Sequence, residues 1–162
     1  MKSQMRSGPN MKPDTRAILE DRRLRQGWTT FLRQFTWDHV GTFTFPFTKC
    51  SADLATRRFE HWANGLCRVT QGAVHWAAFP EPTHEGVFHL HALLGGTTRL
   101  SVEQMERRWH YRNSIHVKIE QYLEPGGFQH YATKGISTSY SEVALSKSLR
   151  SRVGHAGVLV IP

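Results

Sequence analysis

The chain has 162 residues, 39% of them hydrophobic, which suits a single domain with a real core. A formal net charge of +8 and a pI near 10.0 favour a polyanionic partner, above all nucleic acid. The basic N-terminus lacks the apolar segment of a secretory signal, and no run reaches the ~18 apolar residues of a membrane span. Cys50 and Cys67 form no CxxC motif. We therefore expect a cytoplasmic or nucleoid-associated protein without a membrane partner.

The first 35 residues carry basic side chains in two different settings. Residues 1–13 contain Gly, Pro, Ser and Lys without periodicity and predict a disordered basic arm. From 14 to 35, apolar residues recur at loosely helical spacing, with Asp14 as a candidate N-cap and a break near Gly27. We expect one or two short helices there, which carry the candidate DNA-binding residues Arg22, Arg23 and Arg25.

A strand and a helix follow. HVGTFTFPF (39–47) alternates small polar residues with phenylalanines, as a strand does. Residues 51–66 predict a helix with Ser51 as its N-cap and with Leu54, Phe59, Trp62 and Leu66 near one face.

The next two segments predict a β-hairpin. AVHWAAFPE (73–81) and VFHLHALL (87–94) are strand-like, and His84, Glu85 and Gly86 between them suit a three-residue loop with Gly in the left-handed position.

The remaining elements complete a repeated pattern. Residues 101–109 predict a helix capped by Ser101, residues 115–120 alternate as a strand, and residues 126–134 suit another helix. The tail, 141–162, is basic and then apolar, and could add an edge strand.

The order β-α-β-β-α-β-α predicts an α+β fold over residues 14–140, with a ferredoxin-like antiparallel sheet and helices on one face. In that topology the second strand lies at a sheet edge. Pro80 and Pro82, two residues apart in this strand, lack an N–H on the same side, which also requires an edge. The two arguments agree independently.

His89 and His91 are the first candidate site. Residues i and i+2 of a strand project from the same face, so the two imidazoles form half of a metal site. With the predicted loop, Glu81 pairs with His89 and adds a carboxylate to the same patch. Two imidazoles and a carboxylate suit Mn²⁺ or Mg²⁺. If the register slips, Glu85 or His84 replaces Glu81 as the third ligand.

Tyr131 and Lys134 are the second candidate site. Three residues apart in HYATKG, they are neighbours on one face of the predicted helix. A metal and a nearby ammonium can stabilise a phenolate and the charge that develops on a phosphate. The same spacing also suits a Tyr packed on the sheet beside a solvated Lys.

Three strings in this order resemble the His-hydrophobic-His (HUH) endonucleases, and most closely the rolling-circle replication initiator (Rep) proteins. The resemblance spans roughly residues 38–136. GTFTFPF, with Thr42 and Thr44, resembles the first family motif, which is associated with DNA recognition. FHLHALL resembles the metal-binding motif, and YATK resembles the motif that carries the nucleophile.

The resemblance implies an HUH fold and a metal-dependent nickase for single-stranded DNA at a replication origin or hairpin. Glu81, His89 and His91 would hold the ion that polarises the scissile phosphate. Tyr131 would attack it, leaving a 5′-phosphotyrosyl link and a free 3′-OH that primes rolling-circle replication, while Lys134 helps to position the metal or the phosphate. A second attack would transfer and religate the strand.

Departures from some relatives sharpen this expectation. The next tyrosine, Tyr140, lies beyond Gly135, which favours a single-tyrosine enzyme. The chain has no GxxxxGK[ST] phosphate-binding loop, so unwinding would need a host helicase.

Two alternatives stay open. One is a single-tyrosine transposase with the same chemistry, and the other is a non-catalytic module that stacks bases on Phe43, Phe45 and Trp76.

Overall fold

The computed structural model describes residues 15–45, 51–72, 74–82, 88–113, 116–123 and 143–153. Within these ranges, no helix has the length and apolar character needed to cross a bilayer. The predicted arm, the Asp14 cap, the hairpin loop and the helix over 126–134 lie outside the described residues.

The described elements follow the predicted core order. They are α1 (Thr15–Leu32), β1 (His39–Phe45), α2 (Ala52–Thr70), β2 (His75–Pro82), β3 (Phe88–Gly95), α3 (Val102–Asn113), β4 (Val117–Gln121), β5 (Ala144–Leu145) and α5 (Lys147–Val153). The strands form one sheet in the order β4-β1-β3-β2-β5, and its four described pairings are antiparallel. The class is α+β, and the order of the first four strands is consistent with the predicted ferredoxin-like topology.

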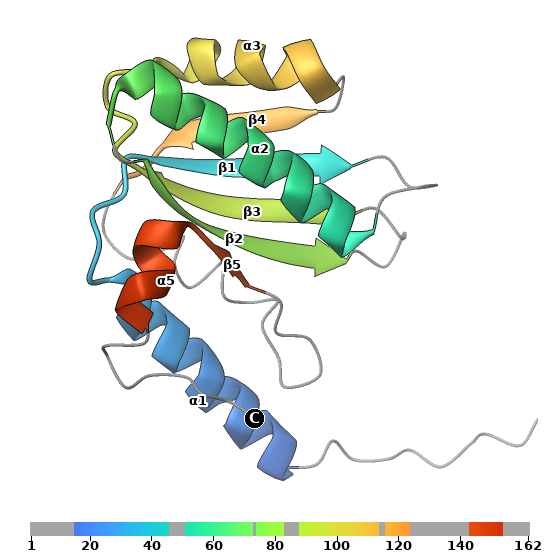
Figure 1. Cartoon of the computed structure of the whole chain (residues 1–162). Coiled ribbons are helices and arrows are strands. Elements are labelled where there is room, and N and C mark those ends of the chain that lie inside the picture. Colours follow the sequence, from blue (N-terminus) through green and yellow to red (C-terminus); the bar gives the residue numbers. More distant parts are fainter. Residues whose placement is uncertain are drawn as a thin grey trace, which may run out of the picture.

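The larger core lies between the sheet and the helices α2 and α3 (Figure 1). It is rich in aromatic rings, of which alternate residues of β1 supply Phe43 and Phe45 and the helices supply Phe59, Trp62 and Trp109. Trp109 is fully buried, with its ring centroid 4.7 Å from that of Phe43 and 5.8 Å from that of Trp62. Trp62 Nε1 donates to the carbonyl of Met105 at 3.3 Å, which ties α2 to α3.

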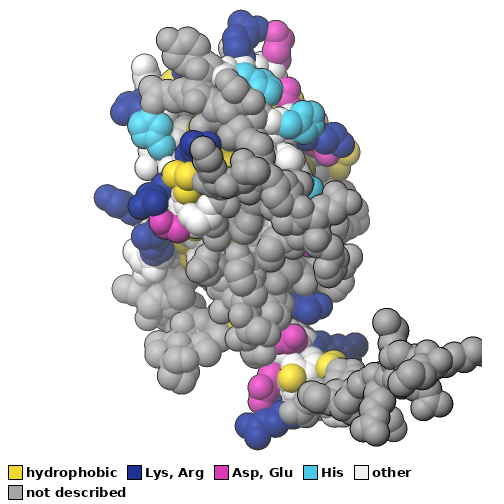
Figure 2. Space-filling model, turned by 90° about the vertical axis from the view of Figure 1, so that its right-hand side faces the viewer, with side chains coloured by type: hydrophobic (Ala, Val, Ile, Leu, Met, Phe, Trp, Pro, Cys, Tyr) yellow, Lys and Arg dark blue, Asp and Glu magenta, His cyan; other side chains and the backbone are white. Residues whose placement is uncertain are grey.

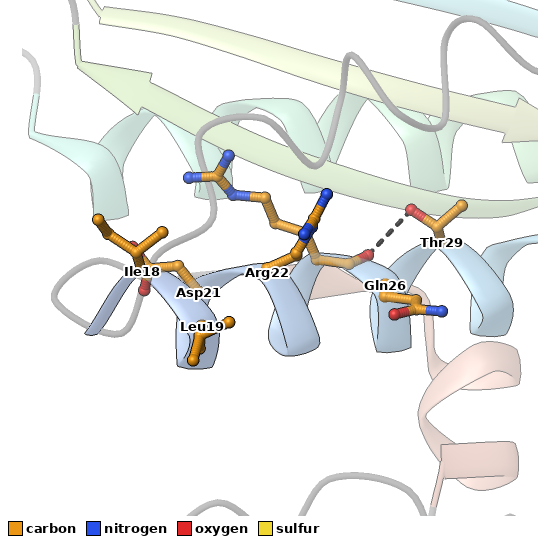
Figure 3. A pocket seen from close by; sticks show the side chains of 7 residues that line it. Ile18, Leu19, Asp21, Arg22, Gln26 and Thr29 are labelled. Carbon is orange, nitrogen blue, oxygen red and sulfur yellow. Dashed lines mark hydrogen bonds between the residues drawn. The ribbon is translucent and has the colours of Figure 1, made fainter. Parts of the chain in front are cut away.

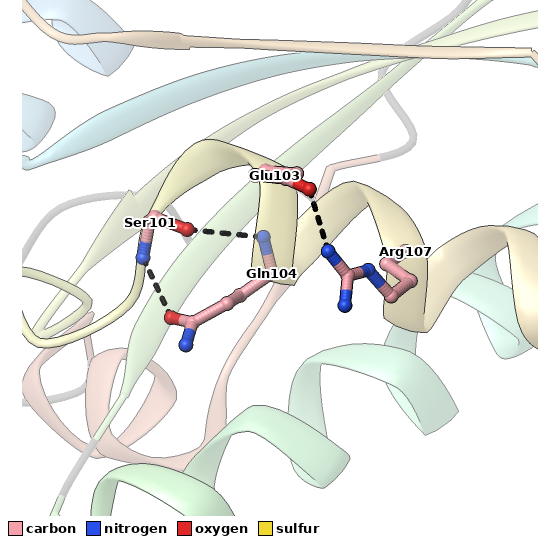
Figure 4. Close-up of polar contacts among 4 residues, drawn as sticks. All are labelled: Ser101, Glu103, Gln104 and Arg107. Atoms are coloured by element: carbon pink, nitrogen blue, oxygen red, sulfur yellow. Dashed lines mark hydrogen bonds and ion pairs between the residues drawn. The ribbon is translucent and has the colours of Figure 1, made fainter.

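The N-termini of α2 and α3 are capped as predicted. Ser51 Oγ accepts from the Leu54 N–H at 3.2 Å. Ser101 and Gln104 form a reciprocal capping box, in which Ser101 Oγ accepts from Gln104 N–H and Gln104 Oε1 accepts from Ser101 N–H (Figure 4). These caps fix where the two helices begin above the sheet.

The prediction that the helices pack on one face of the sheet is wrong, because α1 and α5 pack on the face opposite to α2 and α3 (Figure 1). Their contact forms a second core, in which Leu24, Phe31 and Leu32 of α1 and Leu149 of α5 pack against Leu93 of β3 and its neighbours. The sheet is therefore a middle layer with apolar side chains on both faces.

The predicted break at Gly27 is also wrong, since α1 runs unbroken from Thr15 to Leu32. A single glycine inside a helix costs only about 1 kcal/mol relative to alanine. Burial of Leu24, Phe31 and Leu32 on either side of Gly27 offsets that cost.

The second strand is not the outermost one. β5 pairs with β2 at Ala77 and Ala78, so the prediction of an edge position is wrong for this half of the strand. Pro80 and Pro82 lie beyond that pairing. The two prolines therefore fall where β5 needs no N–H donor from β2.

Candidate metal centre

The register of the sheet brings the predicted ligands to one face. Glu81 of β2 pairs with His89 of β3, which confirms the predicted pairing, and His91 lies two residues along β3. On the other side of β3, Thr44 pairs with His89 and Thr42 pairs with His91. This face is opposite to the one that carries the aromatic core under α2 and α3, because Leu90, between the two histidines, belongs to that core.

His91 is held on two sides by hydrogen bonds. Its Nε2 lies 2.8 Å from Glu81 Oε2, and its Nδ1 lies 3.2 Å from Thr42 Oγ1. The imidazole is only 4% exposed, whereas the Glu81 side chain is 37% exposed. The carboxylate thus connects a buried ring with solvent, and the threonine fixes the orientation of that ring.

Burial is the main influence on the charge of His91. It lowers the pKa of the imidazole below the ordinary 6.5, although the hydrogen bond and charge of Glu81 act in the opposite direction and His89 adds to the lowering. A lowered pKa favours the neutral imidazole at neutral pH. Neutral imidazole is the form that binds metal ions.

The donor set fits a divalent ion after a small shift of side chains. An ion about 2.1 Å from a ring nitrogen lies about 3.2 Å from the ring centroid, so two rings that share it at an octahedral or tetrahedral angle have centroids about 4.5 to 5.2 Å apart. The centroids of His89 and His91 are 6.2 Å apart. Among the described residues, however, no three His, Cys, Asp or Glu side chains already converge as a metal-binding group. The short contact between His91 Nε2 and Glu81 Oε2 needs a shared proton, which an ion would replace.

A polar row continues from the histidines across the sheet to β4. Lys118 pairs with Thr42, and the Thr44 N–H donates to the carbonyl of His116 at 2.9 Å. Lys118 Nζ lies 2.9 Å from Glu120 Oε1, and both side chains are more than half exposed. Figure 2 views the molecule from the end of the sheet at which β1 and β2 end, where histidine and basic side chains lie on the surface. Sequence reasoning missed Lys118, although the alternation of this strand and the predicted topology together could have found it.

The predicted DNA-binding arginines lie on α1 and not on the strands that carry the histidine pair. Arg22 and Arg25 border a hollow of ≈ 550 Å³ along α1, together with the exposed Ile18 and Leu19 (Figure 3). Arg23 borders a separate hollow on the same helix. Neither hollow is lined by His89 or His91.

The proposed nucleophile and its partner lie outside the described residues, as do the alternative metal ligands. These residues are Tyr131, Lys134, His84 and Glu85. The described part of the candidate site consists of Glu81, His89, His91, Thr42 and Thr44.

The aromatic residues of the alternative binding module are not available to bases. Phe43 and Phe45 are fully buried and Trp76 is 3% exposed, and all three belong to the core under the helices. The prediction that they could stack bases on an open sheet is wrong, because α2 and α3 cover that face.

Comparisons with known proteins give no neighbour for this chain: no protein-family model, curated protein or solved structure matches it.

Proposed function

We propose that the protein is a metal-dependent nickase and strand transferase for single-stranded DNA, of the single-tyrosine HUH type that initiates rolling-circle replication. The observation that supports it best is the pairing of Glu81 with His89 on the face that also carries His91. The resemblance of FHLHALL and YATK to the family motifs supplies the reaction, and the net charge of +8 suits the substrate.

Glu81, His89 and His91 would hold the ion, which is Mn²⁺ or Mg²⁺. When bound, the ion polarises the scissile phosphate and lowers the cost of the charge that develops there. Thr42, through His91 Nδ1, orients the imidazole so that Nε2 points toward Glu81.

Tyr131 acts as the nucleophile. Its Oη forms a bond to phosphorus as the bond from phosphorus to the 3′-oxygen breaks. The leaving 3′-oxygen takes up one proton, and the phenol loses one. The products are a 5′-phosphotyrosyl link and a free 3′-OH. Attack by a second 3′-OH on the phosphotyrosine reverses the step and joins the strands, so no external energy source is needed.

Lys134 and Lys118 of β4 act on the DNA backbone. The ammonium of Lys134 neutralises charge on the phosphate beside Tyr131. Lys118 lies in register with Thr42 and His91, where it suits an adjacent phosphate of the same strand. A host helicase would supply the single strand.

The test is formation of a covalent adduct. Wild-type protein with Mn²⁺ is expected to cleave an origin-like single-stranded oligonucleotide labelled at its 3′ end and to remain attached to the labelled fragment in a denaturing gel. Tyr131→Phe should form no adduct and keep its DNA affinity. Tyr140→Phe, which removes the next tyrosine, is the matched control and should cleave as the wild type does.

The metal centre is tested separately. Glu81→Ala should weaken Mn²⁺-dependent cleavage at least about tenfold, whereas His110→Ala, which removes an exposed histidine of α3, should not. An adduct that persists in Tyr131→Phe would show that another residue is the nucleophile. DNA binding without cleavage under any divalent metal would refute the nickase.

A further inference from the structure

A basic groove lies between α2 and α3, on the face of the molecule opposite to the candidate metal centre. It has a volume of ≈ 420 Å³. Its basic lining residues are His61, Arg68, Arg107 and Arg108, all exposed, and the residues that line it include no carboxylate.

Two of these arginines are available for a ligand. Arg107 forms an ion pair with Glu103 one turn earlier in α3 (Figure 4). Arg68 and Arg108 have no carboxylate within ion-pair distance among the residues that the structure describes. One lies on each helix, so the two guanidinium groups border the groove from both sides.

A glycine leaves free space at the floor of the groove. Gly65 lies in the middle of α2, where a glycine costs about 1 kcal/mol relative to alanine. A Cβ built there would meet only Arg68 Nη2, at 3.9 Å, so the packing of the fold does not require a glycine at this position. A longer side chain at residue 65 would instead occupy the space beside Arg68.

We propose that this groove binds the phosphate backbone of duplex DNA, separately from the candidate metal centre. Guanidinium groups match phosphate oxygens in a two-pronged geometry. An open groove with arginines on both sides and no carboxylate in its lining suits a polyanion. Contacts to phosphates alone carry no sequence information, so the groove would hold any duplex.

The choice of DNA as the partner rests on the proposed function. A nickase that cuts an exposed single strand next to paired DNA gains affinity if a second face of the protein holds the flanking duplex. The two faces are separated by the sheet, so one molecule could contact the single strand at the histidine pair and the duplex at the groove.

The probe is a short fluorescent duplex of arbitrary sequence, and its affinity is measured by anisotropy between about 50 and 200 mM salt. The slope of log K against log[salt] is negative, and each lost phosphate contact makes it shallower by about 0.9. Arg68→Ala/Arg108→Ala should therefore make the slope shallower by nearly two, and reduce the affinity at 0.1 M salt at least about tenfold. Gly65→Leu, which keeps every charge, should weaken binding by filling the groove.

The matched control is Arg16→Ala/Lys147→Ala, which removes the same charge from α1 and α5. If the groove pair and the control pair change the salt slope equally, the effect is one of net charge and the proposal is overturned. It is also overturned if the groove variants bind poly-glutamate less tightly but bind duplex DNA as the wild type does, since the groove would then take an acidic protein segment.

The same variants separate this inference from the nickase. Cleavage of a short single-stranded oligonucleotide does not involve the groove and should be unchanged in Arg68→Ala/Arg108→Ala. If the wild type never cleaves but the groove variants lose duplex affinity as described, the groove stands and the nickase fails. If cleavage occurs but the salt slope is unaltered, the groove fails and the nickase stands.

Discussion

The hydrogen bond between Thr42 and His91 assigns the threonine a role that differs from direct DNA recognition. Thr42 Oγ1 lies 3.2 Å from His91 Nδ1, and His91 Nε2 lies 2.8 Å from Glu81 Oε2. A group that holds one ring nitrogen of a metal-binding histidine fixes the direction in which the other nitrogen points. Substitution of Thr42 therefore tests whether Glu81 and His91 belong to a metal centre.

The informative variant is Thr42→Val, because it removes the hydroxyl and keeps a β-branched side chain of similar shape. Loss of an outer partner of a metal-binding histidine weakens metal binding about 10- to 100-fold, which is about 1.4 to 2.7 kcal/mol. The His91 ring is only 4% exposed, so solvent cannot readily replace the lost partner. A cost of about 1 to 3 kcal/mol to stability is therefore also expected.

The assay follows Mn²⁺ binding without requiring activity. The electron paramagnetic resonance signal of free Mn²⁺ is titrated with the wild type and with each variant, and yields the dissociation constant. Thr44→Val is the matched control, because Thr44 is a half-buried threonine of the same strand and face, paired with His89. The Mn²⁺ dissociation constant of Thr44→Val should lie within about twofold of the wild-type value. That change is small beside the tenfold change expected for loss of an outer partner of a metal-binding histidine.

One pattern of results would refute the reasoning. If Thr42→Val binds Mn²⁺ as tightly as the wild type but binds metal-free single-stranded DNA more weakly, Thr42 contacts DNA, as the family resemblance implies. An equal loss of Mn²⁺ affinity in Thr42→Val and Thr44→Val would indicate a general disturbance of β1.

Three further predictions concern stability, each measured by urea unfolding. Ser101→Ala removes one half of the capping box and should cost about 1 kcal/mol. Trp109→Ala, at a fully buried position, should cost about 3 to 5 kcal/mol, whereas Leu123→Ala, at a residue 80% exposed, should change stability by less than about 0.5 kcal/mol. Burial lowers the pKa of His39 below the ordinary 6.5 despite the opposing charge of a neighbouring carboxylate. The unfolded chain then binds this proton more readily, so stability should fall as the pH drops below about 6.5, and His39→Gln should flatten that fall.

Local rules predicted the central part of the fold well. The alternation in β1 correctly indicated that Phe43 and Phe45 share a face, and both are buried. The caps at Ser51 and Ser101 were found from sequence because each cap joins a serine hydroxyl to a backbone N–H only three residues later. These signals depend on short stretches of chain, which a sequence displays directly.

Features that depend on long-range packing were not predictable in the same way. The apolar residues of α1 indicated a helix, but not that it packs on the face opposite to α2. β5 is only two residues long, too short for any periodicity, and it forms through pairing with Ala77 and Ala78. The link from Thr42 to His91 depends on the register between β1 and β3, which are separated by a helix and another strand.

The Glu81–His89 pair is the exception among long-range features, for a physical reason. β2 and β3 are consecutive antiparallel strands, so the position of the turn between them fixes which residues pair. The pairing could thus be predicted from the hairpin alone, without knowledge of the rest of the sheet.

The two-sided structure of the sheet makes the site open to mutational tests. Leu90, Ala92 and Leu94 of β3 point into the larger core, while His89 and His91 alternate with them and point to the other face. Substitutions of Thr42, Glu81 or His89 therefore leave the aromatic core of Phe43 and Trp109 intact. Because the candidate centre lies on the face opposite to the aromatic core, loss of Mn²⁺ binding in these variants can be measured on protein whose larger core is intact.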